Sequence, residues 1–162
     1  MRRRIVAGNW KLHGTRAFAT ALVAEIAATP VPGVELVILP PLPYIGDLIE
    51  DFEGTPLVFG AQDVSRNEQG AYTGEVSASM LVDVGARYGL VGHSERRQYH
   101  AETSELVALK FQAAINAGLR PTKSYMETYS VTGPATRLLQ VPMAGGAVEE
   151  VYRDRDAFAH DR

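Results

Sequence analysis

Apolar and polar positions follow a repeating order along the chain as far as residue 121. Short apolar runs alternate with segments in which apolar side chains recur every three or four positions, the spacing of one helix face. The expected strands are 5–7, 34–39, 57–59 and 90–91, and the expected helices are 15–28, 44–52, 77–84 and 103–117. Apolar strands separated by helices favour a parallel sheet covered by helices. The pattern therefore predicts an α/β fold with four strand-then-helix units.

The regular pattern ends after Pro121. In the segment 122–162, Pro134, Pro142 and Gly145-Gly146 interrupt the apolar residues, which keep neither a helical nor an alternating period. We expect a patterned part, residues 1–121, followed by an irregular tail that is disordered or frameshifted, because ordering a backbone costs about 1–2 kcal/mol per residue. The residues leave open whether this tail is native, frameshifted or fused.

Composition excludes several classes of function. The 16 Lys+Arg and 19 Asp+Glu residues give a net charge of −3, and they form no basic block of the kind that binds nucleic acid or an anionic membrane. The absence of cysteine excludes disulfides and thiolate metal sites. The four histidines have no ligand-like spacing, and no glycine-rich phosphate loop is present, so we expect neither a metal nor a cofactor. No apolar stretch is long enough to span a bilayer, which favours a cytoplasmic protein.

Polar residues follow the predicted strands. Asn9 and Lys11 come after the first strand, Gln62-Asp63 after the third, and His93 and Glu95 after the fourth. The carboxyl ends of the strands carry the ligand site in parallel α/β folds. An ammonium group there can fix a phosphate or stabilise a developing oxyanion. A solvated lysine is the alternative interpretation of Lys11.

The stretch Gly92-His93-Ser94-Glu95-Arg96 admits two interpretations. If a helix begins directly behind His93, its positive amino end disfavours the imidazolium and keeps the ring neutral. Glu95 would then pair with Lys11 or an arginine, or remain an ordinary surface carboxylate. The alternative is a nucleophile elbow around Ser94, but Arg96 stands where that turn requires glycine. The first interpretation is therefore favoured.

The segment 61–77 is longer than the two to six residues of a usual βα loop. A loop that projects past the sheet can dock on a second subunit, with Tyr72 and Thr73 near its tip. Thr103 and Gly118 are placed as the N-cap and C-cap of the last predicted helix.

Several motifs, in order, resemble one enzyme family. "VAGNWKLHG", "AQDVSRNEQGAYTGEVSASMLVDVGARYGLVGHSERR" and "KFQAAINAGLRP" resemble triosephosphate isomerase continuously from about Arg3 to Pro121. The resemblance implies the first four βα units of a (β/α)8 TIM barrel and a cytoplasmic homodimer without a cofactor. It also implies the glycolytic and gluconeogenic interconversion of dihydroxyacetone phosphate and glyceraldehyde 3-phosphate, an aldose-ketose isomerisation.

The resemblance assigns roles to individual residues. Asn9 and Lys11 would bind substrate, with Lys11 holding the phosphate and the developing negative charge. His93 would be the neutral electrophile that polarises the carbonyl, and Glu95 would organise Lys11.

It also assigns residues to a dimer interface. Thr73 would reach into the partner subunit's active site, and Glu75 would meet Arg96 across the interface.

The chain also departs from the family. Such barrels have eight units in about 250 residues, and only four units precede the change in pattern. The family's catalytic glutamate, in a Tyr-Glu-Pro context after the sixth strand, and the phosphate loops after strands seven and eight have no counterpart; Glu127 and Glu149-Glu150 lack the flanking residues. Three interpretations remain open: a truncated, inactive isomerase, a non-catalytic dimerisation or assembly module derived from it, and another sugar-phosphate enzyme of the barrel class completed by a second chain.

Overall fold

The structure is a computed structural model that describes residues 4–123 and 128–130. Its elements are β1 (Arg4–Asn9), α1 (Arg16–Ala27), β2 (Val34–Leu39), α2 (Leu42–Asp51), β3 (Val58–Ala61), α3 (Ala78–Asp83), β4 (Tyr88–Val91), α4 (Ser94–Tyr99), α5 (Ser104–Ala117), β5 (Arg120–Lys123) and β6 (Thr128–Ser130). The four predicted strand-then-helix units are confirmed.

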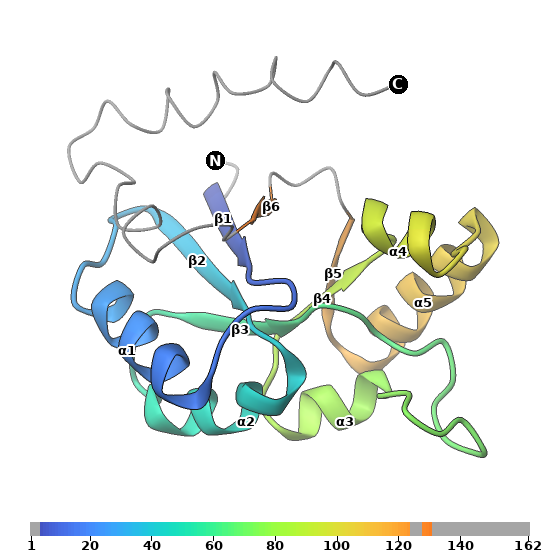
Figure 1. Ribbon diagram of the computed structural model, residues 1–162, viewed down its shortest axis with the longest axis horizontal. Helices are drawn as coiled ribbons and strands as arrows, with labels where there is room; N and C mark the ends of the chain where they lie inside the picture. The colour runs from blue at the N-terminus through green and yellow to red at the C-terminus, as the bar shows by residue number, and fades with distance from the viewer. Residues whose placement is uncertain (1–3, 124–127, 131–162) are drawn as a thin grey trace, which may run out of the picture.

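The sheet is parallel and curled. Its strand order is β5-β4-β3-β2-β1-β6, and each neighbouring pair is parallel. Figure 1 shows the strands in an arc, with α1, α2, α3 and α5 along its convex side. In the described part of the chain, β5 and β6 are the two edges of the sheet. The predicted architecture, an incomplete TIM barrel, is confirmed.

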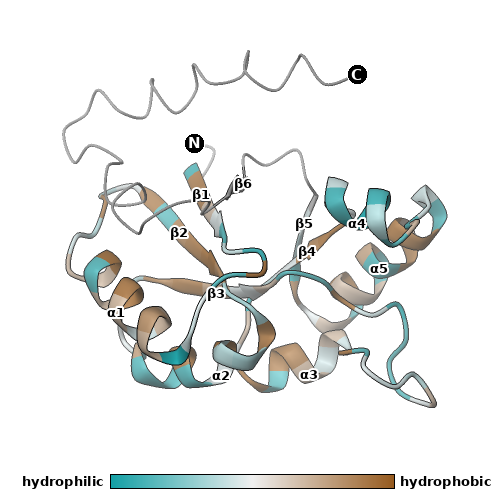
Figure 2. Ribbon diagram, viewed as in Figure 1, coloured by the Kyte–Doolittle hydropathy of each residue, from teal (hydrophilic) through white to brown (hydrophobic). Residues whose placement is uncertain are grey.

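Alternate residues of the strands pack into two apolar layers. The outer layer lies between the sheet and the helices and includes Leu22, Ile38 and Phe59. The inner layer, on the concave side, consists of Ala7, Val37, Leu39, Tyr88 and Leu90, with Ile5 and Val58 packed against it. Figure 2 shows hydrophobic colour along the strands and on parts of the helices, whereas α4 is largely hydrophilic. A sheet with apolar side chains on both faces is typical of a parallel barrel.

The helix caps predicted around α5 are present. The Thr103 hydroxyl accepts a hydrogen bond from the Leu106 N–H at 3.2 Å. Gly118 has a φ of 90°, in the left-handed region that glycine tolerates at a helix end.

The structure adds two strands that the sequence pattern did not predict, β5 and β6. Of these, β6 lies within the predicted irregular tail and pairs with β1 from Ala7 opposite Thr128 to Asn9 opposite Ser130. β5 pairs with β4 from Tyr88 opposite Arg120 to Val91 opposite Lys123, and so crosses the boundary expected near residue 121. Pro121 hides this strand because proline lacks a backbone donor and is tolerated mainly at sheet edges, which is where β5 lies in the described part of the chain. Residues 124–127 and 131–162, where the rest of the predicted tail falls, lie outside the described residues.

Candidate active site

The backbone of Lys11 is held in an unusual conformation directly after β1. Its φ of 51° lies in the left-handed region, which non-glycine residues adopt rarely and at a cost of about 1–3 kcal/mol. The Oδ1 atom of buried Asn9 accepts the Lys11 N–H at 3.0 Å. The Gln62 amide donates to the Lys11 carbonyl at 3.0 Å and to the Leu39 carbonyl at 2.8 Å. The side-chain amides of Asn9 and Gln62 therefore fix the backbone of Lys11, from which its side chain projects.

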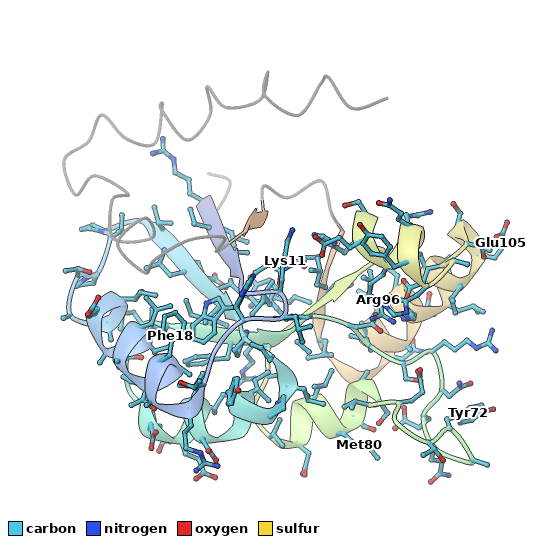
Figure 3. The ribbon with its side chains drawn as sticks, viewed as in Figure 1. Lys11, Phe18, Tyr72, Met80, Arg96 and Glu105 are labelled. Carbon is cyan, nitrogen blue, oxygen red and sulfur yellow. The ribbon has the colours of Figure 1, made fainter. Side chains whose placement is uncertain are left out.

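The Lys11 side chain pairs with the Glu95 carboxylate, which belongs to α4. Figure 3 shows Lys11 extending from the loop after β1 on the side of the sheet opposite α2 and α3. The Glu95 side chain is 41% exposed and that of Lys11 is 26% exposed, so solvent and a small anion can both reach the pair. The predicted approach of groups from β1 and from the segment after β4 is thus present in the structure.

His93 caps α4 through its side chain. Its Nδ1 atom accepts a hydrogen bond from the Glu95 N–H at 3.2 Å, which places the proton of the neutral ring on Nε2. Burial lowers the pKa of His93 below its ordinary value; the charge of Glu95 opposes this effect and that of Lys11 adds to it. The ring is therefore neutral at pH 7 and can donate a hydrogen bond from Nε2.

Four charged side chains, one of them from α4, form a cluster between α4, α5 and the loop after β3. Arg96 donates from Nε to Glu102 at 2.7 Å and lies 2.9 Å from Asp63 through NH2. Lys110 donates to both Asp63 oxygens at 2.8 Å and to Glu102 at 2.6 Å. The charged cluster ties the loop after β3 to α4, to the loop before α5 and to α5 itself.

Burial shapes the titration of the charged cluster. The side chains of Lys110 and Glu102 are only 5% and 2% exposed. Burial raises the pKa of Glu102, but its bonds to Lys110 and Arg96 outweigh burial and hold that pKa below its ordinary value. Burial is the largest effect on Asp63 and raises the pKa of that carboxyl despite its bonds to Lys110.

Sequence reasoning missed both Gln62 as a support of Lys11 and the charged cluster. The sequence pattern identifies Gln62-Asp63 only as a polar pair at a strand end. Their partners are far away in sequence, because Gln62 bonds a residue 51 positions earlier and Asp63 one 47 positions later. The one local signal is a polar pair placed directly after a buried strand.

The predicted interface residues are separated in the single chain. Thr73 and Glu75 are exposed in the loop between β3 and α3. Arg96 contacts Asp63 and Glu102 of the same chain. Figure 3 shows Tyr72 at the outer end of that loop, and Met80 directed outward from α3.

The described residues contain neither a membrane-spanning helix nor a cluster of metal-ligating side chains. None of the helices there has both the length and the apolar character needed to cross a bilayer. Nor do these residues include three or more His, Asp or Glu side chains placed to hold a metal ion.

Comparison with known proteins identifies the family. The model of the family described as "Triosephosphate isomerase" matches residues 4–132. The triosephosphate isomerase of Xanthomonas campestris pv. campestris (strain 8004) is 80% identical over 122 residues, which cover 75% of this chain and 49% of that protein. The triosephosphate isomerase of Stenotrophomonas maltophilia (strain R551-3) is 70% identical over 129 residues, 79% of this chain and 51% of that protein. The chain thus spans about half the length of these relatives. It belongs to the triosephosphate isomerase family.

Proposed function

We propose that this chain binds triose phosphates and carries the substrate-binding and electrophilic part of a triosephosphate isomerase active site. The observation that supports the proposal is the meeting of Lys11, Glu95 and His93 at the carboxyl ends of β1 and β4. The substrates are dihydroxyacetone phosphate and glyceraldehyde 3-phosphate, the pair that the family interconverts.

Each of these groups has a distinct task in the proposal. The Lys11 ammonium attracts the phosphate and the negative charge that develops on the substrate oxygens. The neutral His93 ring donates from Nε2 to the carbonyl oxygen and polarises it. Glu95 sets the position of the ammonium, and Asn9 sets the backbone from which the lysine projects.

The isomerisation also needs a base that removes a proton from carbon. The carboxylate at the described site, Glu95, is occupied by Lys11 and by its contact with His93. General-base proton transfer typically contributes about 10²–10⁴-fold to the rate. We therefore infer that the 162-residue chain alone binds substrate without isomerising it at an enzymatic rate.

Binding and turnover are measured separately. Titration of the ¹⁵N-labelled chain with dihydroxyacetone phosphate, followed by NMR, is expected to shift the His93 ring signals. Lys11→Met abolishes this shift, whereas Arg16→Gln, which removes an exposed ion pair between α1 and α2, preserves it. An unchanged His93 signal at saturating ligand contradicts the binding proposal. Turnover in a coupled assay near the usual enzyme range of about 1–10³ per second contradicts the inferred inactivity.

A second candidate is a non-catalytic dimerisation or assembly module. The observation in its favour is the exposure of apolar side chains around the loop after β3, with Tyr72 47% and Met80 55% exposed. In that role Thr73, Glu75 and Arg96 would lie at the contact between two copies. Concentration-dependent association in sedimentation experiments, together with no response to dihydroxyacetone phosphate, favours this candidate over the first.

A further inference from the structure

A hydrogen-bonded bridge crosses the concave face at the amino ends of the strands. The Tyr88 hydroxyl on β4 donates to Glu35 Oε1 on β2 at 2.6 Å. Arg120 on β5 donates to the same carboxylate oxygen at 3.2 Å and to the Tyr88 hydroxyl at 3.3 Å. Its guanidinium also lies 5.7 Å from the centre of the Tyr88 ring. The bridge thus connects β2 with β4 and β5, and it passes over β3.

Glycine at position 60 makes room for this crossing. A Cβ atom added to Gly60 would lie 2.6 Å from the Tyr88 Cβ, 2.7 Å from the Tyr88 carbonyl oxygen and 2.8 Å from Leu39 Cδ2. The β4 backbone at Tyr88 and the side chain of Leu39 therefore pack directly against the backbone of β3 at Gly60. Any side chain at position 60 would push them away.

The bond between Tyr88 and Glu35 is well protected. Tyr88 is 3% exposed, and the Glu35 side chain is 15% exposed. Burial, followed by the bond to Glu35, raises the pKa of Tyr88, so the hydroxyl remains a donor at neutral pH. The Arg120 side chain is 59% exposed and adds a weaker, solvent-screened contact.

Curvature of the sheet is what allows the candidate active site to form. β1 and β4 are separated by two strands, and neighbouring strands lie about 4.8 Å apart, so a flat sheet would keep β1 and β4 about 14 Å apart. Lys11 after β1 and Glu95 after β4 are nevertheless in contact. The bridge spans β2 to β4, which are the middle strands of the same arc, and Tyr88 lies five residues before His93.

We propose that Tyr88 and Glu35 fix the curvature of the sheet and so act as positioning residues that hold His93 and Glu95 opposite Lys11. The link to catalysis rests on the proposed function, but the geometric claim does not. A ring of strands sets its own curvature when it closes. The described sheet ends at β5 and β6, and the bridge is a contact across its concave face that joins strands in the middle of the arc.

The test measures the distance between the two sides of the site. The chain has no cysteine, so two introduced cysteines carry spin labels at defined positions. Leu12, next to Lys11 and 94% exposed, and Tyr99, at the end of α4 and 71% exposed, are suitable sites. We expect a narrow distance distribution for Leu12→Cys/Tyr99→Cys by electron paramagnetic resonance. Adding Tyr88→Phe, which removes only the hydroxyl, is expected to broaden the distribution and shift it to longer distances.

Two matched variants separate positioning from general stability. Glu35→Gln, made in the labelled chain that keeps Tyr88, retains an acceptor for the Tyr88 hydroxyl and is expected to leave the distribution narrow. Ile26→Val weakens the outer layer without touching the bridge and is expected to lower the unfolding midpoint with no change in distance. If Tyr88→Phe does not fold, Glu35→Met breaks the same bond from the other side and carries the test.

The outcomes are decisive and independent of substrate binding. A folded Tyr88→Phe or Glu35→Met chain with an unchanged distance distribution overturns the proposal. So does an equal broadening in Ile26→Val. Failure of dihydroxyacetone phosphate to bind leaves the distance result intact and counts only against the proposed function.

Discussion

At the scale of single residues, the site depends on side chains that hold other groups in place. Lys11 is fixed by Asn9 and Gln62 through its backbone and by Glu95 through its ammonium. His93 uses Nδ1 to cap α4, which leaves Nε2 for a ligand.

The first prediction concerns the protonation of His93. Because burial lowers its pKa in the folded chain, the unfolded chain takes up the proton first as the pH falls through the ordinary value of 6.5. The free energy of unfolding should therefore decrease as the pH falls from 6.5 to the folded pKa. Urea unfolding at a series of pH values measures it, and His93→Gln should remove this part of the dependence.

The second prediction concerns the charge beside that ring. Glu95 favours the imidazolium, so Glu95→Gln should lower the pKa of His93 further. NMR titration of the ring nitrogens measures the change, and Asp47→Asn on α2 serves as a distant control. A rise in the His93 pKa in Glu95→Gln would contradict the assigned geometry.

The third prediction concerns Gln62. Gln62→Met removes the donor shared by the Lys11 and Leu39 carbonyls. The Leu39 carbonyl still accepts from the Trp10 N–H at 3.1 Å, so the main loss is the bond to the Lys11 carbonyl, and one such hydrogen bond contributes about 0.5–1.5 kcal/mol. The free energy of unfolding should fall by that amount in urea titration. Gln112→Met, at an exposed position on α5, should change it little.

At the scale of elements, α4 is anchored by charge and not by apolar packing. None of its six residues is buried, and its colour in Figure 2 is largely hydrophilic. Arg96 links it to Asp63 and Glu102, which are in turn held by Lys110. The helix that carries Glu95 therefore depends on the charged cluster for its position.

The fourth prediction follows from this anchoring. Lys110→Met leaves Glu102 buried with less compensation, and breaking a buried pair costs about 3–5 kcal/mol. Adding Glu102→Leu should recover part of the loss, because the second charge is then removed as well. Calorimetry of the two single variants and the double variant measures the coupling, and strictly additive losses would refute it.

Sequence patterns predicted the helices and strands that bury a continuous face. The predicted range 34–39 is β2 itself, and Thr103 and Gly118 cap α5 as expected. β5 was missed because Pro121 and its polar neighbours do not show the alternation of apolar and polar residues that indicates a strand. Its extended conformation is stabilised by its pairing with β4. The charged cluster was missed because ion pairs between residues far apart in the sequence produce no repeating pattern within either segment.

At the scale of the whole molecule, the described sheet has two open edges, and apolar side chains are exposed on the loops and helices around it. β5 pairs with β4 alone and β6 with β1 alone in the described part of the chain. Unpaired edges and exposed apolar groups both favour association. Leu12, Tyr72 and Met80 contribute to this exposed surface.

The fifth prediction is that the chain self-associates. Sedimentation velocity over a range of concentrations is expected to show species heavier than 17.6 kDa. Met80→Glu on α3 should shift the distribution toward the monomer if that surface takes part. A single sharp boundary at the monomer mass across all concentrations would exclude association.

Glycine at position 60 also restricts which substitutions this sequence can accept during evolution. A larger residue at position 60 would displace Tyr88 and Leu39. Such a change should therefore be tolerated only in relatives in which the hydrogen bond between Tyr88 and Glu35 has already been lost. Glu35, in turn, loses the hydroxyl that it accepts once Tyr88 is replaced. Residues 35, 60 and 88 should therefore change together among relatives, with glycine at 60 wherever tyrosine and glutamate are paired. Covariation of three positions on three different strands would be the evolutionary trace of one bend in the sheet.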